Sequence, residues 1–395
     1  MSIASSTPAE LAQSAREHGR IGIDTEFVSE GRYRALLCLV QVAIDAPGGG
    51  SHVEILDPIE GFDHEPIAAV LGDPDVQVVM HAGSQDVAIL RRTWGVAMKN
   101  IFDTQVAAGF AGFSAQSSYA NLLQGALGVH VAKTASFTRW DVRPLTQEQI
   151  EYARADVDDL LALADDLQRR LRESGRLQWA TEECRRLEEI TDERDPETVY
   201  RRLPRVNQLR PRARAVAREL AGWRERTAAA EDRPVGSVLA DMALVEIAKR
   251  QPKSAKEIGA IRGVRPDVLR RRGDDIIAGV RRGQEAPPLP PEQARTAPPD
   301  PADAPLVALS EAVVRARTLE AGLAYELVAT RADLGEIVAA ARRRNDEPDV
   351  RTLQGWRRDL VGEELLELLA GKVTLSVSER GALSIRNGSE PATTA

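Results

Sequence analysis

The segment IGIDTEFV at residues 21–28 decides the expected fold of the N-terminal half of this chain. Its isoleucines, phenylalanine and valine are typical of a β-strand, and Gly19 and Ser29-Glu30-Gly31 bound it on either side. Side chains alternate between the two faces of a strand, so Asp24 and Glu26 emerge on the same face, about 7 Å apart. The segment therefore predicts a strand that presents two carboxylates to one side.

Two carboxylates on a mostly apolar strand need a compensating charge. Ile21, Ile23 and Phe27 take the opposite face, while Val28 shares the face of the acids, so we expect burial on both sides of the strand. A buried, unpaired carboxylate is costly, and a divalent cation is its simplest partner, since hard oxygen ligands suit Mg²⁺ or Mn²⁺. From this segment alone, a strand end with two solvated acids is an equal alternative, so the rest of the chain has to decide.

Length and composition indicate a soluble globular protein. The chain has 395 residues, of which 43% are hydrophobic and 28% charged, enough for two or three domains with a sizeable core. No segment approaches the roughly 18 apolar residues of a membrane span, and residues 1–10 lack the pattern of a secretory signal. Cys38 and Cys184 do not make a disulfide framework. We therefore expect a cytoplasmic protein with no membrane partner.

Net charge varies strongly along the chain. The whole chain carries −8, which by itself argues against a nucleic-acid partner. Residues 1–204 hold 20 Lys and Arg against 32 Asp and Glu, and residues 284–395 hold 13 against 18. Residues 205–283 hold 19 against 10, a net charge of +9. A solvated Arg-rich surface is the alternative, but it would not concentrate the excess in one segment, so the basic block predicts a phosphate-binding surface.

The hydrophobic pattern of the N-terminal half predicts strands followed by interleaved helices, an α/β arrangement. Short connections imply an antiparallel meander of the first three strands, and a helical segment at 66–71 permits a parallel crossover to the fourth. Thr146 and Gln149 form a capping box at the start of the longest helix. The strands are expected at 21–28, 34–45, 52–56 and 76–80, and the helices at 84–94, 103–110, 119–125 and 146–174.

The C-terminal half is predicted to be helical and divided by a Pro-rich linker. A charged helical connector at 175–204 leads into short helical units, and helical periodicity resumes at 306–377. The linker contains PPLPP and APPDPADAP, so we expect it to be extended and semi-rigid.

Two further acids and a tyrosine are candidate functional residues. Asp86 lies in the first turn of the helix that follows the fourth strand, and Tyr152 and Asp156 share a face of the longest helix. Asp86 alone could be a helix-start acid stabilised by the dipole, and Tyr152 a tyrosine at the edge of the core. Asp156 lies ten residues into its helix, where the dipole gives no help, so a carboxylate there needs another reason. Asp103 opens a helix in FDTQ and is expected to cap it, not to bind a metal.

Together these residues resemble the DEDD superfamily of 3′–5′ exonucleases in its tyrosine-bearing branch. The matching motifs are Asp-Thr-Glu-Phe at 24–27, His-x-x-x-x-Asp-x-x-x-Leu at 81–90 and Tyr-x-x-x-Asp at 152–156, in that order. The neighbouring segments FDTQVAAGF and RWDVRPLTQEQIEYARADV are similar to ribonuclease D, so the resemblance covers roughly residues 15–200. LAGWRERTAAAEDRPVGSVLADMALVEIAKRQP is similar to a helicase-and-RNase-D C-terminal (HRDC) domain, and residues 306–377 resemble a second helical domain more weakly.

The resemblance implies a ribonuclease H-like α/β exonuclease domain followed by two all-α, HRDC-like domains. It implies that four carboxylates hold two divalent metal ions, Mg²⁺ or Mn²⁺, and that the tyrosine orients the attacking water. Asp24 is the expected bridging ligand. A phenol with a pKa of about 10 is a poor base, so metal polarisation has to deprotonate the water. The expected catalytic residues are Asp24, Glu26, Asp86, Tyr152 and Asp156, and all but Tyr152 are expected metal ligands.

Four further residues are candidates for substrate contact. Phe27 could stack on the terminal base, with core packing as a nearly equal alternative. His81 could reach the scissile phosphate or the ribose, although a structural hydrogen bond is the commoner use of such a histidine. Lys133 and Arg143 precede the longest helix and could hold backbone phosphates.

The expected function is metal-dependent 3′–5′ trimming of structured RNA, such as tRNA precursors, with release of 5′-nucleoside monophosphates. The expected partner is an RNA with a free 3′ end, and a monomer suffices because catalysis needs no second copy of any motif. The alternatives are a 3′–5′ DNA exonuclease in repair and a non-catalytic RNA-binding scaffold. The expected domains are an exonuclease at 1–204, a basic HRDC domain at 205–284, a linker at 285–305, a second helical domain at 306–386 and a disordered tail at 387–395.

Overall fold

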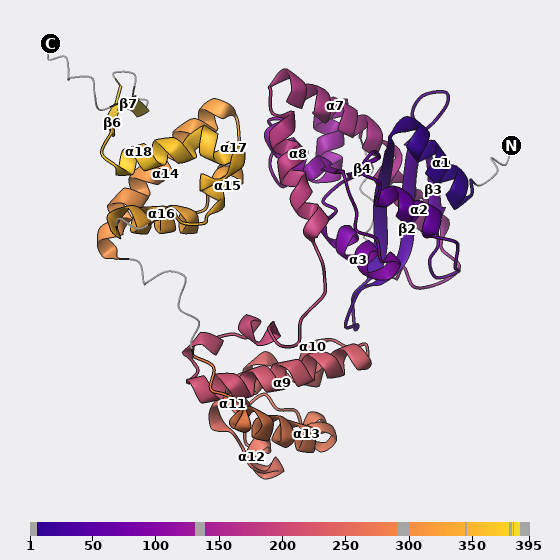
Figure 1. Ribbon diagram of the computed structural model, residues 1–395. Coiled ribbons are helices and arrows are strands. Elements are labelled where there is room, and N and C mark those ends of the chain that lie inside the picture. Colours follow the sequence, from indigo (N-terminus) through magenta and orange to yellow (C-terminus); the bar gives the residue numbers. More distant parts are fainter. Residues whose placement is uncertain are drawn as a thin grey trace.

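The computed structural model describes residues 6–130, 139–290, 300–343, 346–378, 381 and 383–387. Its N-terminal part is built on a five-stranded sheet with the order β3-β2-β1-β4-β5 (Figure 1). β1 therefore lies at the centre of the sheet. The strands are β1 (Arg20–Val28), β2 (Leu36–Asp45), β3 (Ser51–Leu56), β4 (Gln77–Met80) and β5 (Ile101–Asp103).

The strand directions follow the predicted pattern. β1 pairs antiparallel with β2, and β2 pairs antiparallel with β3, which is the expected meander. β1 pairs parallel with β4 after the crossover helix α2 (Glu65–Leu71), and β4 pairs parallel with β5. The register of β1 against β2 shifts between Glu26 and Phe27, so the strand is irregular directly after its second acid.

Helices cover both faces of the sheet. On one face α1 (Pro8–His18), α2 and α3 (Ser84–Trp94) share an apolar core with Ile21 and Ile23 of β1. On the other face α4 (Thr104–Phe110), α7 (Leu160–Glu173) and α8 (Leu177–Arg185) share a second core, with α5 (Tyr119–Leu122) and the π-helical turn Leu123–Leu127 at its margin. α6 (Gln147–Asp158) packs on β1, β2 and β3. The N-terminal part is thus a three-layered α/β unit, as predicted.

Some helices and strands differ from the prediction. α1 and the three-residue β5 have no counterpart in it, although Thr7 and Glu10 form a capping box at the start of α1. The expected helix at 146–174 is two helices, because Asp159 leaves the helical conformation with φ −101° and ψ 7°. α6, before the break, packs on β1, β2 and β3, and α7, after it, packs on β1, β2 and β4.

Residues 199–285 form a helical unit with a core of its own. Its two long helices pack closely where glycine replaces a side chain: a Cβ at Gly283 would lie 2.4 Å from the Cα of Val216. The unit contains the 3₁₀ turns Val199–Arg202 and Val206–Gln208, followed by α9 (Pro211–Ala230), α10 (Val235–Val238), α11 (Asp241–Arg250), α12 (Ala255–Gly259) and α13 (Pro266–Glu285).

The C-terminal region is helical and ends in two strands. Its helices are α14 (Ala304–Ala321), α15 (Tyr325–Val328), α16 (Arg331–Arg343), α17 (Gly355–Arg357) and α18 (Glu363–Leu369), with a 3₁₀ turn at Arg351–Leu353 and a π-helical turn at Arg358–Gly362. β6 (Val373–Val377) and β7 (Leu383–Asn387) form an antiparallel pair, so the expectation of an all-α region is wrong at this end. Alternating apolar residues in VTLSV and LSIRN are the local signal for these strands.

The C-terminal helices share a core with the α/β unit. The ring of Trp356 stacks on Trp179 of α8, with centroids 5.1 Å apart, and meets Phe110 of α4 edge-on at the same distance. The buried guanidinium of Arg357 donates to Glu183 of α8 at 2.6 Å. Trp356 therefore joins the C-terminal helices to the α/β unit.

Among the helices of the described part of the chain, none is long and apolar enough to cross a membrane.

Candidate active site

β1 carries Asp24 and Glu26 on the face that packs against α6 and α7. Gly22 lies on the same face, and a Cβ there would meet Leu160 and Leu161 of α7 at 3.5 Å and 3.4 Å. This close approach brings the junction of α6 and α7 over β1. Asp156, in the last turn of α6, is thereby placed above the strand.

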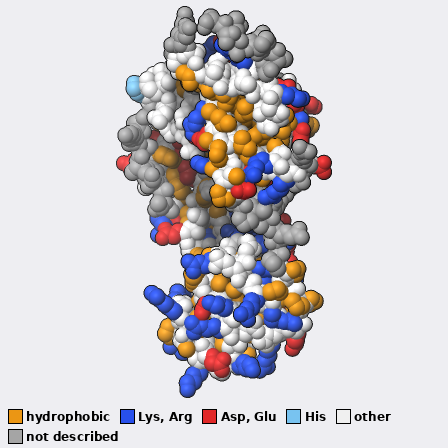
Figure 2. Space-filling model, turned by 90° about the vertical axis from the view of Figure 1, so that its left-hand side faces the viewer, with side chains coloured by type: hydrophobic (Ala, Val, Ile, Leu, Met, Phe, Trp, Pro, Cys, Tyr) orange, Lys and Arg blue, Asp and Glu red, His pale blue; other side chains and the backbone are white. Residues whose placement is uncertain are grey.

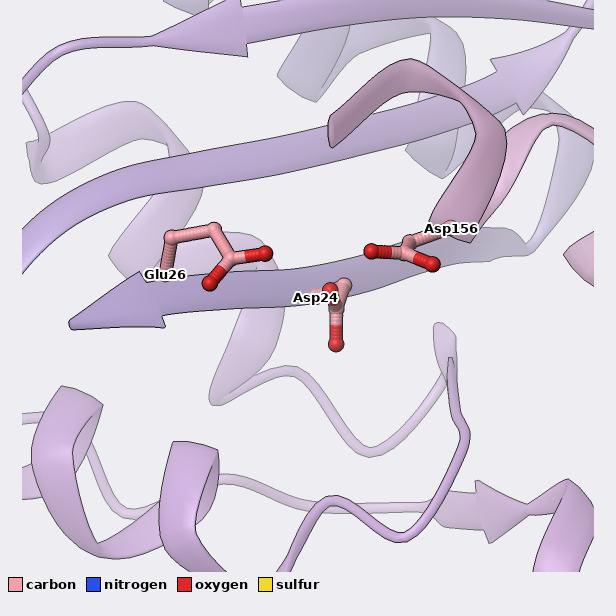
Figure 3. Close-up of side chains that lie close together, drawn as sticks. All are labelled: Asp24, Glu26 and Asp156. Carbon is pink, nitrogen blue, oxygen red and sulfur yellow. The ribbon is translucent and has the colours of Figure 1, made fainter. Parts of the chain in front are cut away.

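The carboxylates of Asp24, Glu26 and Asp156 form a cluster. Each offers one oxygen that lies within 4.8 Å of the other two. Figure 3 shows Glu26 and Asp156 pointing toward one another along β1, with Asp24 between them. Among the residues that the structure describes, no other group of three or more such side chains comes as close together.

Asp86 joins the site from the first turn of α3 and is 7% exposed. Its carboxylate accepts a hydrogen bond from the Thr25 hydroxyl, so the residue between the two strand acids ties α3 to β1. Asp86 does not belong to the group of three, but its charge acts on Asp24 and Glu26. The structure thus brings the four predicted acids to one region, three of them in direct proximity.

Burial raises the pKa values of all four carboxyl groups, and repulsion by neighbouring site acids adds to this at Asp24 and Glu26. Burial raises the pKa of Asp24 well above its usual range, and the charges of the other three acids add to the effect. Burial and the charges of Asp156 and Asp86 raise the pKa of Glu26 to about 8. Burial raises the pKa of Asp86 and that of Asp156 to about 6, although hydrogen bonds from Thr25 and Tyr152 act in the opposite direction.

Within the described residues, no Lys or Arg offsets this negative charge by an ion pair with Asp24, Glu26, Asp86 or Asp156. Asp156 also lies near the C-terminal end of α6, where the helix dipole disfavours an anion. The fold holds these acids together at a cost that a bound divalent cation would relieve.

Tyr152 lies one helical turn before Asp156, as predicted. Its hydroxyl donates a hydrogen bond to the Asp156 carboxylate, and its ring packs against Trp140 with centroids 6.0 Å apart. Burial, followed by the charges of Asp156, Glu26 and Asp24, raises the pKa of Tyr152 above its ordinary value. The phenol therefore stays protonated at neutral pH and acts as a hydrogen-bond donor.

His81 lies directly after β4 and contacts α4. Its Nδ1 is 2.9 Å from the Thr104 hydroxyl, which itself donates to the Met80 carbonyl at 3.0 Å. Because that hydroxyl proton is already used, Nδ1 of His81 is the donor, which leaves Nε2 as an acceptor. Burial lowers the pKa of His81, so the ring is neutral. Its ring centroid is 5.3 Å from that of Tyr119.

The other predicted substrate contacts have different surroundings. Phe27 packs against the core beside α3 and also lines a pocket together with Gln85 of α3, so the structure is compatible with both core packing and base stacking. Arg143 donates to both oxygens of Asp57, at 2.5 Å and 2.7 Å, and to the carbonyls of Trp140, Val142 and Cys38. Its donors hold the chain before α6, so the geometry lends no support to a phosphate contact. Lys133 lies outside the described residues.

Two residues near the acids are missing from the predicted site. Asp103 caps α4, as expected, but it also accepts from the backbone N–H groups of Ala82 and Gly83 and so holds the loop that leads to Asp86. The buried hydroxyl of Tyr119 has no hydrogen-bond partner in the described part of the chain. The negative charges of Asp156 and Asp24 act on this hydroxyl. Asp103 was recognisable only as a cap, and nothing in the local sequence of Tyr119 sets it apart.

This fold and this cluster of acids define a 3′–5′ exonuclease with an HRDC domain. A family model described as 3′–5′ exonuclease matches residues 2–172, and the HRDC domain model matches residues 213–280. The ribonuclease D of Granulibacter bethesdensis is 35% identical over 389 residues, which cover 96% of this chain and 95% of the relative. That of Gluconacetobacter diazotrophicus is 37% identical over 373 residues, or 93% and 92% of the two chains.

The solved structures agree with these relatives. The crystal structure of Escherichia coli RNase D superposes with a TM-score of 0.81 at 29% identity, over 92% of this chain and 96% of that one. The chain belongs to the ribonuclease D family and is a 3′–5′ exoribonuclease. The predicted family and activity are confirmed.

Proposed function

We propose that this exoribonuclease trims the 3′ ends of structured RNAs, including tRNA precursors and other small stable RNAs, and releases 5′-nucleoside monophosphates. The observation that carries the proposal is the cluster of Asp24, Glu26 and Asp156 on the α/β unit. The Escherichia coli relative is described as an exoribonuclease involved in structured RNA processing, which supports this class of substrate.

The acids fit divalent cations. Four carboxyl groups with raised pKa values and no basic partner among the described side chains are a suitable set of oxygen donors for Mg²⁺ or Mn²⁺. We propose that they hold two ions, with Asp24 as the shared ligand. Such ions, when bound, supply Lewis-acid activation of water and stabilise the leaving oxygen of a phosphodiester.

The neighbouring side chains orient the substrate. The protonated hydroxyl of Tyr152 donates a hydrogen bond beside Asp156, where it can direct the attacking water. Phe27 offers an apolar ring on which any terminal base can stack. Nε2 of the neutral His81 ring can accept a hydrogen bond from a ribose hydroxyl, and this assignment favours the ribose over the phosphate among its two expected targets.

The basic HRDC unit is proposed to hold RNA beyond the active site. Figure 2 shows many Lys and Arg side chains on the lower body, which is this unit. Two of its arginines are excluded from such a role by burial, because Arg214 donates to backbone carbonyls and Arg224 pairs with Asp241. Arg270 and Arg281 are exposed on one face of α13 and have no ion pair in the described structure.

The proposed domains keep their predicted limits. They are an exonuclease domain at 1–204, a basic HRDC domain at 205–284, a linker at 285–305 and a second HRDC-like domain at 306–386, which the β6–β7 pair makes only partly helical. Residues 291–299 of the linker and 388–395 of the tail lie outside the described residues. The cytoplasmic location and the monomeric state stay predictions.

The proposal is tested with a 3′-tailed tRNA and a single-stranded DNA of equal length, each incubated with Mg²⁺, with Mn²⁺ and with EDTA. We expect the RNA to shorten from its 3′ end and EDTA to abolish the reaction. Faster loss of the DNA would keep the metal site but assign the enzyme to DNA repair. Absence of hydrolysis of either substrate would leave an RNA-binding scaffold.

A further inference from the structure

The loop between β1 and β2 connects the exonuclease core to the HRDC unit. The Tyr33 hydroxyl donates to Glu225 of α9 at 2.9 Å, and the Tyr33 backbone N–H donates to Asp232 at 3.1 Å. Arg32 forms an ion pair with Asp232 at 2.7 Å. Figure 1 shows this loop extending from the sheet toward the end of α9. The loop is therefore held at two points by residues from a distant part of the sequence.

Glu225 depends on partners from outside its own helical unit. Its side chain is 3% exposed, and its carboxylate is bound by Tyr33 and, at 3.4 Å, by Arg194 of the connector. A buried carboxylate that lost such partners would be strongly disfavoured. α9 is also pressed against the connector, because a Cβ at Gly222 would lie 2.9 Å from the Pro196 carbonyl oxygen. This junction is tightly built.

The same loop forms one wall of a cavity of about 290 Å³ that β1 and α3 also line. Tyr33 and Arg34 line the wall formed by the loop, while Phe27 of β1 and Gln85 of α3, which are adjacent in the chain to Glu26 and Asp86, line another side. Arg34 forms no hydrogen bond or ion pair in the described structure, and its guanidinium carbon lies 5.5 Å from the centre of the Tyr33 ring. Two aromatic rings and a free guanidinium suit the base and phosphate of a nucleotide.

We propose that the HRDC unit positions the wall of this pocket through the contact between Tyr33 and Glu225, and thereby sets how tightly the enzyme holds the 3′-terminal nucleotides of RNA. Glu225 is a positioning residue, because it acts through Tyr33 and Arg34 and touches no substrate. The inference rests on the proposed function, since the acids beside the pocket must cleave RNA. This positioning role is separate from phosphate binding by the HRDC surface. Binding of a substrate that is too short to reach that surface still depends on Glu225.

The test uses the full-length protein and two RNAs, a 5′-labelled tetranucleotide and a 3′-tailed tRNA. The variants are Tyr33→Phe, Glu225→Leu and the double substitution, and Arg270→Gln on the exposed face of α13 is the control. We expect each single variant to raise the KM for the tetranucleotide about three- to tenfold, with kcat changed less than about twofold. The double variant should be no worse than Glu225→Leu alone, because Tyr33→Phe removes the donor and Glu225→Leu the acceptor of the same hydrogen bond. Arg270→Gln should weaken tRNA binding and leave the tetranucleotide KM unchanged.

Three results would overturn the inference. Unchanged tetranucleotide KM values in both single variants would show that the contact does not shape the pocket. Additive effects in the double variant would show that the two residues act separately. If Glu225→Leu lowers the melting temperature, Tyr33→Phe decides, because it removes a single hydroxyl from a half-buried side chain. A wild-type enzyme that hydrolyses neither RNA would instead refute the proposed function itself.

Discussion

The active site and the HRDC unit differ in whether their buried charged groups have partners. The four active-site acids have raised pKa values and no basic partner in the described structure. The buried Arg214 of the HRDC unit, 1% exposed, donates to the carbonyls of Val206, Asn207, Leu209 and Leu289. A fold tolerates a buried charge that has partners, whereas a cluster of buried and half-buried carboxylates without basic partners indicates a site that acquires its counter-charge from a ligand.

The largest expected effect comes from removing the uncompensated charge. Asp24→Asn combined with Glu26→Gln should lower the single-turnover rate of RNA hydrolysis by about 10³-fold or more, since the site loses two proposed metal ligands. RNA affinity, measured by filter binding, should change little, because the HRDC surface is intact. Asp158→Asn is the matched control on α6: this exposed carboxylate lies outside the cluster, and its loss should leave the rate within about twofold. Equal losses in both variants would contradict the assignment.

A smaller loss of activity is expected when the hydrogen bond from Tyr152 to Asp156 is removed. Tyr152→Phe keeps the ring that packs against Trp140 and removes only the hydroxyl that donates to Asp156. We expect kcat to fall about 10- to 100-fold with KM nearly unchanged, as for a group that orients the attacking water. Steady-state kinetics on a tailed tRNA measures both constants. A wild-type kcat in this variant would remove Tyr152 from the mechanism.

The raised pKa values of the active-site acids also predict how the stability of the fold depends on pH. The pKa of Glu26 is raised from 4.5 to about 8, so folding favours its protonated form. This contribution is full below about pH 4.5 and is lost as pH rises through about 8. In EDTA, Glu26→Gln should therefore gain unfolding free energy over the wild type with rising pH, reaching roughly 1–3 kcal/mol at alkaline pH. Urea denaturation at several pH values gives this difference, and a gain that is independent of pH would argue against it.

The smallest expected effect concerns the exposed cations. Arg270→Gln with Arg281→Gln should weaken tRNA binding about two- to fivefold and reduce the slope of log affinity against log salt by up to about 2. The exposed Lys372, which follows α18 outside the basic block, is the control for a general loss of positive charge. If Lys372→Gln has the same effect on the slope, binding is not localised to the HRDC unit.

The sequence predicts the site better than the surroundings that build it. The alternation of Asp24 and Glu26 on β1 and the one-turn spacing of Tyr152 and Asp156 are local rules, and the structure follows both. Contacts between distant segments, such as the hydrogen bond from Thr25 to Asp86, leave no local signal in the sequence. Nor could the pattern show that Arg143 is held by Asp57, 86 residues earlier in the chain, since its own neighbours resemble those of a free surface arginine.

In the fold, as in the site, local patterns predict some features, and contacts between distant segments determine the others. Strands β1 to β4 and helix α3 follow from periodicity and turn residues. The break at Asp159 depends on how α6 and α7 each meet the sheet, and the core shared by Trp356, Phe110 and Trp179 joins segments more than 170 residues apart. Such tertiary contacts override what a single helical segment would do alone.

A titration with Mn²⁺ at pH 7 tests the central claim, that the acid cluster takes its counter-charge from a divalent cation. Calorimetry in two buffers of different ionisation enthalpy measures both binding and proton release. We predict saturable binding that releases protons, because Glu26, with a pKa of about 8, must lose its proton to become a ligand, and we predict that Asp24→Asn with Glu26→Gln abolishes it. Equal Mn²⁺ binding by the wild type and the double variant, or binding without proton release, would contradict the account.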